Sequence, residues 1–252
     1  MLQFIIKCAQ YLQGIGAGSS VESSGERGVL VHLASKHKNS YCVFDVGANQ
    51  GQFAGLVLSV LGDKVELQCF EPSPSTFEIL CIAMQPHGQV KLNNVALGKN
   101  IGSASLYSNK VGSGLASLTR RRLDHFGVDF SRVEDVVVDT LDNFCISSGI
   151  SHIDLLKVDV EGHELDVLYG AESMFKANAI DMVTFEFGGC NIDTRTFFQD
   201  FFYFFSGINM VIYRVTPSGS RVKIDKYSEI LEQFRTTNFL AVRKDYIGIS
   251  VG

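Results

Sequence analysis

Short apolar segments alternate with helix-like segments between residues 41 and 187, and this alternation restricts the fold more than any other feature of the chain. In the run that follows the first apolar segment, Phe53, Leu56 and Val57 are three and four positions apart, which predicts a helix with one buried face. Strands that alternate with helices form a mostly parallel sheet covered on both faces. We therefore predict an α/β fold with a mostly parallel, doubly wound sheet. Its core strands are expected at residues 41–46, 65–70, 89–95, 153–160 and 182–187.

The chain divides into an N-terminal extension and one larger domain. We expect a helical extension and a loop over residues 1–40, because glycine and serine are frequent between residues 13 and 25. The main domain is expected over residues 41–245, followed by a tail at 246–252. With 252 residues, of which 46% are hydrophobic, the chain is long enough to bury the core that this domain requires.

Several parts of the main domain depart from the simple alternation. Residues 98–138 contain glycine- and serine-rich turns and two strand-like runs, so we expect an inserted hairpin or flap. After the strand at 153–160, we expect one helix that continues through Phe175. Near the end of the domain, the runs 210–215 and 239–242 predict an antiparallel C-terminal hairpin.

Charge and cysteine usage exclude several classes of function. The net charge is −5 and the longest basic run is Arg120–Arg122. We interpret this run as solvated surface charge, with the lining of an acceptor pocket as the alternative. A nucleic-acid partner is not expected, because phosphate binding requires clustered positive charge. The six cysteines are scattered without a Cys-x-x-Cys pair, which is typical of a reducing cytoplasm. The most aromatic run, 197–205, contains Gln199 and Asp200 and predicts a core helix, so no membrane span is expected.

The segment 43–51 predicts a strand that ends at an acidic residue and leads through a glycine turn into a helix. Open parallel sheets bind ligands beyond the carboxyl ends of their strands, where Asp45 is expected to lie. Gly47 and Gly51 tolerate positive φ and permit the backbone to approach a ligand closely. A dinucleotide site needs Gly-x-Gly-x-x-Gly, which these two glycines do not supply, so a nicotinamide or nucleotide-sugar enzyme is disfavoured.

Glu71 ends the second strand, where its carboxylate could accept hydrogen bonds from both hydroxyls of a ribose. An acidic turn suits the ammonium and sulfonium of S-adenosylmethionine, whereas it would repel a pyrophosphate. An adenine ring is expected at the end of the third strand. The glycine-bounded loop that contains Ser117 either folds over the cofactor or is a plain surface loop. The residues predicted to bind S-adenosylmethionine are Asp45, Gly47, Asn49, Gly51, Glu71, Pro72, Asn94, Ala96 and Ser117.

The segment after the fourth strand is rich in ionisable side chains. Lys157, Asp159 and Glu161 share one face if the strand continues through them. A buried lysine requires a partner, so an ion pair between Lys157 and Asp159 is expected. The predicted catalytic residues are Asp159, Glu161 and His163, since each could accept the proton of a substrate hydroxyl. Glu164 is interpreted instead as a favourable charge at the start of a helix.

The same acidic side chains could hold a divalent cation such as Mg²⁺, which prefers oxygen ligands. Asp159 and Glu161 follow the fourth strand, and Glu186 lies near the end of the fifth, so all three are expected at one edge of the sheet. The alternative for Glu186 is an ion pair at the rim of the site. The residues leave both a metal-dependent and a metal-independent reaction open.

The motifs together resemble the FkbM family of S-adenosylmethionine-dependent methyltransferases, and they occur in the order typical of that family. The resemblance implies a class I, Rossmann-like methyltransferase fold and methylation of a hydroxyl on a sugar, a surface polysaccharide or a polyketide-type product. The acidic motif of the family matches Asp159 and Glu161, and the stretch 153–171 is the most specific element. The matching stretches are FDVGANQG (44–51), FEPSPSTFEIL (70–80), NNVALG (93–98), VDTLDNF (138–144), IDLLKVDVEGHELDVLYGA (153–171) and VTFEF (183–187).

The cysteine usage favours a cytoplasmic location. We further expect a small-molecule or glycan acceptor, and a homodimer is left open. An alternative is a protein that kept the fold and lost catalysis, such as a scaffold in glycan assembly. The intact set of acidic residues argues against this alternative.

Overall fold

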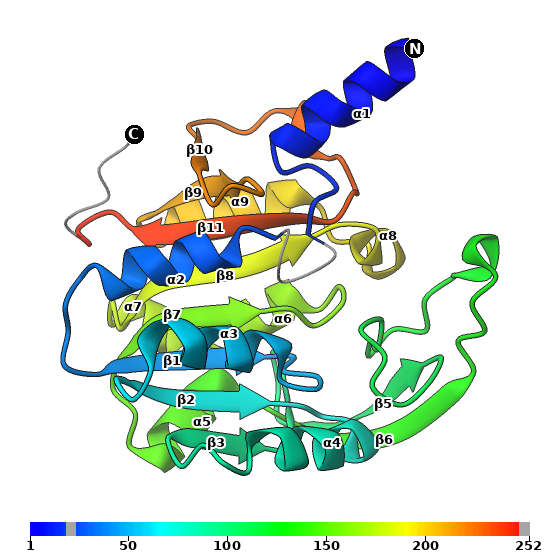
Figure 1. Ribbon diagram of the computed structural model, residues 1–252. Helices are drawn as coiled ribbons and strands as arrows, with labels where there is room; N and C mark the ends of the chain where they lie inside the picture. Colours follow the sequence, from blue (N-terminus) through cyan, green and yellow to red (C-terminus); the bar gives the residue numbers. More distant parts are fainter. Residues whose placement is uncertain (19–23, 247–252) are drawn as a thin grey trace.

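The computed structural model describes residues 1–18 and 24–246, so residues 19–23 of the expected loop and 247–252 of the expected tail lie outside it. In the described part of the chain, eight strands form one sheet in the order β10-β9-β11-β8-β7-β1-β2-β3 (Figure 1). These strands are β1 (Tyr41–Val46), β2 (Val65–Phe70), β3 (Val90–Asn93), β7 (Ile153–Val158), β8 (Ile180–Phe187), β9 (Met210–Val215), β10 (Arg221–Ile224) and β11 (Thr237–Arg243). The pairs β1–β2, β1–β7, β2–β3 and β7–β8 are parallel, which confirms the predicted mostly parallel sheet.

Helices cover both faces of this sheet, as the alternation predicts (Figure 1). Val43 packs with α2, α3 and α4, whereas its neighbour Phe44 packs with α5, α6, α7 and α9. The two-residue period of a strand therefore divides the core into two layers. The helices are α1 (Leu2–Leu12), α2 (Glu26–Ala34), α3 (Gln52–Leu61), α4 (Pro74–Met84), α5 (Leu141–Ser148), α6 (Glu164–Tyr169), α7 (Glu172–Lys176), α8 (Cys190–Thr194) and α9 (Phe198–Gly207), with short 3₁₀ turns at Asp124–Phe126 and Glu229–Leu231.

The predicted single helix through Phe175 is wrong, because α6 and α7 are separate helices. The carbonyl of Gly170 accepts the N–H of Asp142 at 2.9 Å, so the chain turns instead of continuing the helix. The Asp142 carboxylate then accepts the N–H groups of Ser173 (2.8 Å) and Met174 (3.0 Å) at the start of α7. A contact with a distant segment thus ends one helix and begins the next.

The two runs predicted to form a C-terminal hairpin pair with each other, but they are not consecutive strands. β9 and β11 do pair antiparallel, as expected for runs 210–215 and 239–242. However, β10 lies between them in the chain and pairs antiparallel with β9, while β11 is inserted between β8 and β9 and is antiparallel to both. The hairpin in the usual sense is therefore β9–β10, at the edge of the sheet.

The segment expected as an inserted hairpin or flap supplies β5 and most of β6 to a small separate sheet, ordered β4-β6-β5, which we call the flap. Its strands are β4 (Ala96–Leu97), β5 (Gly102–Ser108) and β6 (Arg132–Asp139). Ala96, Leu106, Val136 and Val138 form its buried core. Figure 1 shows that this flap lies beyond the carboxyl ends of the main parallel strands.

The N-terminal segment begins with α1, which has no buried residue and projects from the body of the molecule (Figure 1). After α1, the chain runs along the C-terminal strands: Arg214 Nε donates to the carbonyl of Gln13 at 2.8 Å, and Gly18 N donates to the carbonyl of Thr236 at 3.3 Å. None of the helices within residues 1–18 and 24–246 has the length and apolar character needed to cross a bilayer.

Candidate active site

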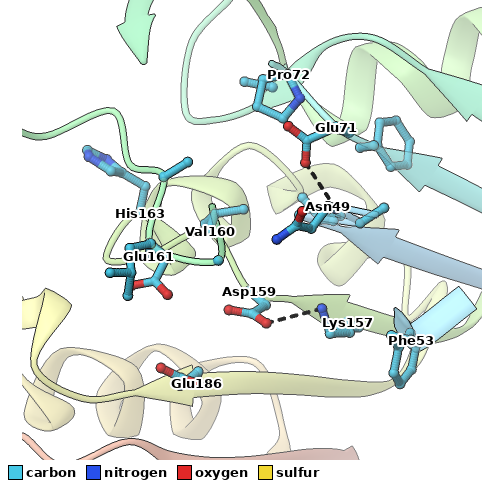
Figure 2. A pocket seen from close by; sticks show the side chains of 18 of the residues that line it. Asn49, Phe53, Glu71, Pro72, Lys157, Asp159, Val160, Glu161, His163 and Glu186 are labelled. Atoms are coloured by element: carbon cyan, nitrogen blue, oxygen red, sulfur yellow. Dashed lines mark hydrogen bonds and ion pairs between the residues drawn. The ribbon is translucent and has the colours of Figure 1, made fainter. Parts of the chain in front are cut away.

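A cavity of about 790 Å³ opens at the carboxyl ends of the parallel strands. Its walls come from the turn after β1, the end of β2, the loop after β7, the end of β8 and the flap, with further residues from α2 and the start of β11. Figure 2 shows Glu71, Asp159, Glu161 and Glu186 around this space. The volume lies within the range of sites that enclose small molecules.

Most of the predicted site residues line this cavity, and four do not. Those that line it are Gly47, Asn49, Glu71, Pro72, Ala96, Asp159, Glu161, His163 and Glu186. Asp45 is fully buried and does not line the cavity, and Gly51 packs against α4. Asn94 and Ser117 hold the backbone of other lining segments, as described below.

The glycine turn after β1 packs tightly against neighbouring segments of the chain. Gly47 and Gly51 have φ values of +84° and +91°, as the prediction of positive φ requires. A Cβ at Gly47 would lie 1.8 Å from the carbonyl oxygen of Asp159, and one at Gly51 would lie 2.7 Å from Cε of Met84. These glycines therefore permit close packing of the turn against the loop after β7 and against α4. Gly47 also lines the cavity, whereas Gly51 does not.

Glu71 presents a buried carboxylate at the end of β2. One oxygen accepts the N–H of Asn49 at 3.0 Å and the other accepts the N–H of Ser73 at 2.9 Å. Burial raises the pKa of this carboxyl to about 7, against the effect of the two backbone donors. Asn94 fixes the same corner, because its Nδ2 donates to the carbonyls of Glu71 (2.8 Å) and Pro72 (3.0 Å).

Lys157 joins β7 to the neighbouring strand and to the loop beyond. Its Nζ lies 3.3 Å from Asp159, which confirms the predicted ion pair, and 3.2 Å from Asp45 on β1. Burial alone would lower the pKa of Lys157, but the two carboxylates raise it above its ordinary value, so it stays charged. Asp45 Oδ2 is buried and has no hydrogen-bond partner among the described residues.

The loop after β7 departs from the strand geometry that we predicted. β7 ends at Val158, and Glu161 has a φ of +55°, so Lys157, Asp159 and Glu161 do not share a strand face. Glu164 stabilises this turn, since its carboxylate accepts the N–H groups of Val160 and Gly162. Glu164 is thus structural, as interpreted, although it orders a loop rather than a helix end.

Arg121 is a residue whose position the sequence did not reveal. Its guanidinium pairs with Glu161 and lies 3.6 Å from Asp193 on α8, so it is not the solvated charge that we expected. Burial raises the pKa of Glu161 to about 8, and the charge of Asp159 acts in the same direction, whereas Arg121 opposes both. Glu161 is therefore poised to exchange a proton near neutral pH.

His163 is held at both ring nitrogens. Nδ1 lies 2.8 Å from Asp166 Oδ2, and Nε2 lies 2.9 Å from the hydroxyl of Thr119 on the flap. Ser117 makes a parallel contact, because its hydroxyl donates to the carbonyl of Glu161 at 2.8 Å. Together with Arg121, these two flap residues bind the flap to the loop that carries the predicted catalytic residues.

The predicted cation ligands do not form a metal site. Among the described residues, the group of His, Cys, Asp and Glu whose ligand atoms all lie within 4.8 Å of one another is His152, Asp154 and Asp181, near the opposite ends of the strands. Asp159, Glu161 and Glu186 do not converge in this way. A lysine and an arginine, Lys38 and Arg243, already pair with Asp154 and Asp181.

A family model described as the methyltransferase FkbM domain matches residues 45–212, which include the turn, Glu71, the flap and the acidic loop. The chain belongs to this family. It is also 31% identical over 139 residues to the 2-O-methyltransferase NoeI of Sinorhizobium fredii (strain NBRC 101917 / NGR234), a match that covers 52% of this chain and 57% of the relative. The chain thus matches little more than half the length of that relative.

Solved methyltransferase structures are less similar to this chain in sequence than the relative above. The O-methyltransferase TomG of Streptomyces achromogenes, in complex with SAM, gives a TM-score of 0.44 at 12% identity, covering 86% of this chain and 79% of that chain. A SAM-dependent O-methyltransferase of Thermotoga maritima gives 0.42 at 9% identity, covering 86% and 64%. The class I methyltransferase fold follows from the strand order itself, with β11 antiparallel between β8 and β9.

Proposed function

We propose that this protein is an S-adenosylmethionine-dependent O-methyltransferase that acts on a hydroxyl of a sugar or glycan. The observation that carries the proposal is one cavity that joins Glu71, at the end of β2, to Asp159 and Glu161, after β7. The Glu71 carboxylate suits the hydroxyls of a ribose. The Asp159 and Glu161 carboxylates suit a reacting hydroxyl. Membership of the methyltransferase FkbM family and the likeness to an O-methyltransferase support the same function.

The residues at the end of β2 fit the adenosine part of the cofactor. Each oxygen of Glu71 accepts one backbone N–H and keeps capacity for a further donor, which the two ribose hydroxyls would supply. Asn49 Oδ1 is buried without a partner among the described residues and lies in the cavity wall, so it too suits a ligand donor. Pro72 and Ala96 offer apolar contact for an adenine ring.

When bound, S-adenosylmethionine supplies an activated methyl group on a sulfonium. The protein's contribution is to hold the acceptor oxygen in line with that group and to exclude water, which provides much of the rate in such reactions. Glu161 would take the hydroxyl proton on its carboxylate, while Arg121 fixes the orientation of that carboxylate. His163, locked between Asp166 and Thr119, would position the loop.

The walls beyond the acidic loop suit an acceptor with both apolar and hydroxyl faces. The flap contributes Leu106, Leu115 and Leu118, which could pack against the C–H face of a sugar ring. Asp159 and Glu186 line the same cavity and could accept hydrogen bonds from ring hydroxyls. The relative's name, a 2-O-methyltransferase, is consistent with transfer to a hydroxyl of this kind.

Mass spectrometry of acceptors tests the proposal. The protein would be incubated with S-adenosylmethionine and a panel of sugars, nucleotide sugars, glycans and polyketide alcohols, with the Glu161→Gln variant as the inactive control. We expect a sugar, nucleotide-sugar or glycan acceptor to gain the mass of one CH₂ group on oxygen with the wild type alone. Methylation of polyketide alcohols only, or equal methylation by the variant, would contradict the proposal.

A further inference from the structure

Glu26 contributes a carboxylate to the cavity from outside the matched family region. It lies at the start of α2, it is 8% exposed, and it lines the cavity together with Thr236 and Asn238 of the C-terminal strand segment. One oxygen accepts the Ser24 hydroxyl at 2.8 Å. Within residues 1–18 and 24–246, Glu26 has no ion pair within 4.0 Å and no donor to its other side-chain oxygen. A carboxylate that is this deeply buried needs a cationic or hydrogen-bonding partner.

The charges around Glu26 are unbalanced. Its electrostatic neighbours are Lys157, Asp159 and Asp45, so three carboxylates surround a single ammonium group. Lys157 is already shared between Asp45 and Asp159, at 3.2 and 3.3 Å. A ligand that brought a second positive charge to this corner would reduce the imbalance and supply the missing donor to Glu26.

The strand order places this corner at the amino-acid end of the cofactor. Glu71 marks the ribose position at the end of β2, and Ala96 lies beyond β3 on the adenine side. The neighbours of Glu26 belong to β1 and β7, which are the next two strands on the other side of β2. If the ribose is held at Glu71, the part of the cofactor that extends away from adenine would lie on the side of Glu26.

We propose that Glu26 binds the α-ammonium group of S-adenosylmethionine, which makes the segment before β1 part of the cofactor site. This inference rests on the proposed function, because it assumes that the ribose is held at Glu71. Gly18 and Glu26, which both line the cavity, would then form a wall at the methionine end of the site. The sequence offered no sign of this role, since a glutamate in a first helical turn is ordinarily a solvent-exposed charge.

Calorimetric titration with two ligands tests the inference. S-adenosylhomocysteine carries the α-ammonium group, whereas 5′-methylthioadenosine has the same adenosine and sulfur but lacks the amino-acid part. For Glu26→Gln, we expect the affinity for S-adenosylhomocysteine to fall by about 10- to 100-fold and that for methylthioadenosine to change by less than about 2-fold. The control Glu78→Gln removes a charge from an exposed position on α4, and it should leave both affinities unchanged.

The outcomes separate this inference from the proposed function. If Glu26→Gln weakens both ligands equally, or leaves S-adenosylhomocysteine binding intact, Glu26 does not bind the ammonium and only this inference fails. The same conclusion follows if Glu186→Gln, and not Glu26→Gln, shows the loss that is selective for S-adenosylhomocysteine. If the folded wild type binds neither ligand, the proposed cofactor site itself fails, and the inference fails with it.

Discussion

The carboxylates around the cavity differ in the groups that contact them, and these contacts indicate what each residue can do. Glu71 is held by two backbone N–H groups, which fix its position without neutralising its charge. Asp159 is paired with Lys157, and Glu161 with Arg121. Among the described residues Glu186 has no hydrogen bond or ion pair, so it is the carboxylate most available to an acceptor. The contacts thus distinguish a carboxylate held in place by the backbone, two carboxylates paired with basic side chains, and one that has no such partner among the described residues.

Replacement of Glu71 by glutamine should weaken cofactor binding. The amide keeps the size of the side chain but loses one acceptor and the charge, so at least one hydrogen bond from the ribose is lost. A hydrogen bond to a charged group contributes about 1.5–3 kcal/mol, which corresponds to a loss of roughly 10- to 100-fold in affinity for S-adenosylhomocysteine. Calorimetry would measure this loss, with Glu66→Gln, an exposed position on the same strand, as the control. Equal affinities for wild type and Glu71→Gln would contradict the ribose assignment.

Replacement of Glu161 by glutamine should reduce turnover and leave cofactor affinity almost unchanged. Glutamine can still bond to Arg121 but cannot accept a proton, so kcat should fall by about 10²–10⁴-fold. In the wild type the base must be ionised, and its pKa is raised to about 8 by burial, so kcat should increase as the pH rises through that value. A pH–rate profile checks both points. A variant that retains wild-type turnover and the same profile would exclude Glu161 as the base.

At the scale of elements, three flap residues bind the flap to the acidic loop. Arg121 pairs with the Glu161 carboxylate, Ser117 donates to the Glu161 carbonyl, and Thr119 contacts His163. Because these contacts converge on one turn, the flap determines where the predicted base lies. Ser117, predicted as a direct cofactor ligand, is placed by its contacts to act through the loop instead.

Replacement of Arg121 by alanine should loosen this connection. Removing one partner of a buried ion pair costs about 3–5 kcal/mol, because a charge is left uncompensated. Arg121 also opposes the rise in the Glu161 pKa, so the midpoint of the pH–rate profile should move to higher pH. Thermal unfolding and the pH–rate profile test the two effects, with the exposed Arg120→Ala as the control. A lower melting temperature without a shift of the midpoint would mean that Arg121 is structural only.

Replacement of Gly47 by alanine should destabilise the turn after β1. A methyl group there would overlap the Asp159 carbonyl oxygen at 1.8 Å, and the φ of +84° is strained for any other residue. We expect a loss of about 3 kcal/mol or more in the free energy of unfolding, measured with urea. In contrast, Gly55→Ala in α3, where a Cβ meets nothing within 4 Å, should stabilise by about 0.5–1 kcal/mol. Equal effects at the two positions would refute the packing explanation.

Local sequence patterns predicted most helices and strands, whereas the features that they missed depend on contacts between segments far apart in the chain. The strand at Val65–Phe70 has the expected ends, and Phe53 and Val57 lie on the buried face of α3, as their spacing predicts. The break between α6 and α7 depends on Asp142, which is distant in sequence, so no local pattern could show it. Arg121 and Glu26 were missed for the same reason, since their burial comes from segments far along the chain.

At the scale of the whole molecule, the two ends of the sheet differ in charge balance. At the amino ends of β7 and β8, Asp154 and Asp181 are paired with Lys38 and Arg243. At the carboxyl ends, burial raises the pKa values of Glu26, Glu71, Glu161 and Glu186, and cationic partners are fewer. This imbalance is located where a cationic cofactor is proposed to bind.

The free protein should therefore lose stability as the pH rises from about 6.5 to about 8.5. In this window Glu71 and Glu161, with pKa values of about 7 and about 8, keep protons in the folded state that they have already lost in the unfolded state. The folded state binds more protons, so the free energy of unfolding falls with rising pH, by about 2–3 kcal/mol across the window. Burial lowers the pKa of His32 to about 4, so this residue changes the stability only below its ordinary pKa of 6.5, outside the window. Urea unfolding at the two pH values measures the change, and a stability that increased would contradict the assigned carboxyl shifts.

The central claim is that the cavity binds S-adenosylmethionine, and calorimetric titration of the folded wild-type protein tests it most directly. We predict saturable binding of one S-adenosylmethionine per chain, and no binding of NAD, because the acidic cavity should repel a pyrophosphate. Titration of NAD under the same conditions provides the comparison. Binding of NAD, or the absence of any binding of S-adenosylmethionine to the folded protein, would contradict the account.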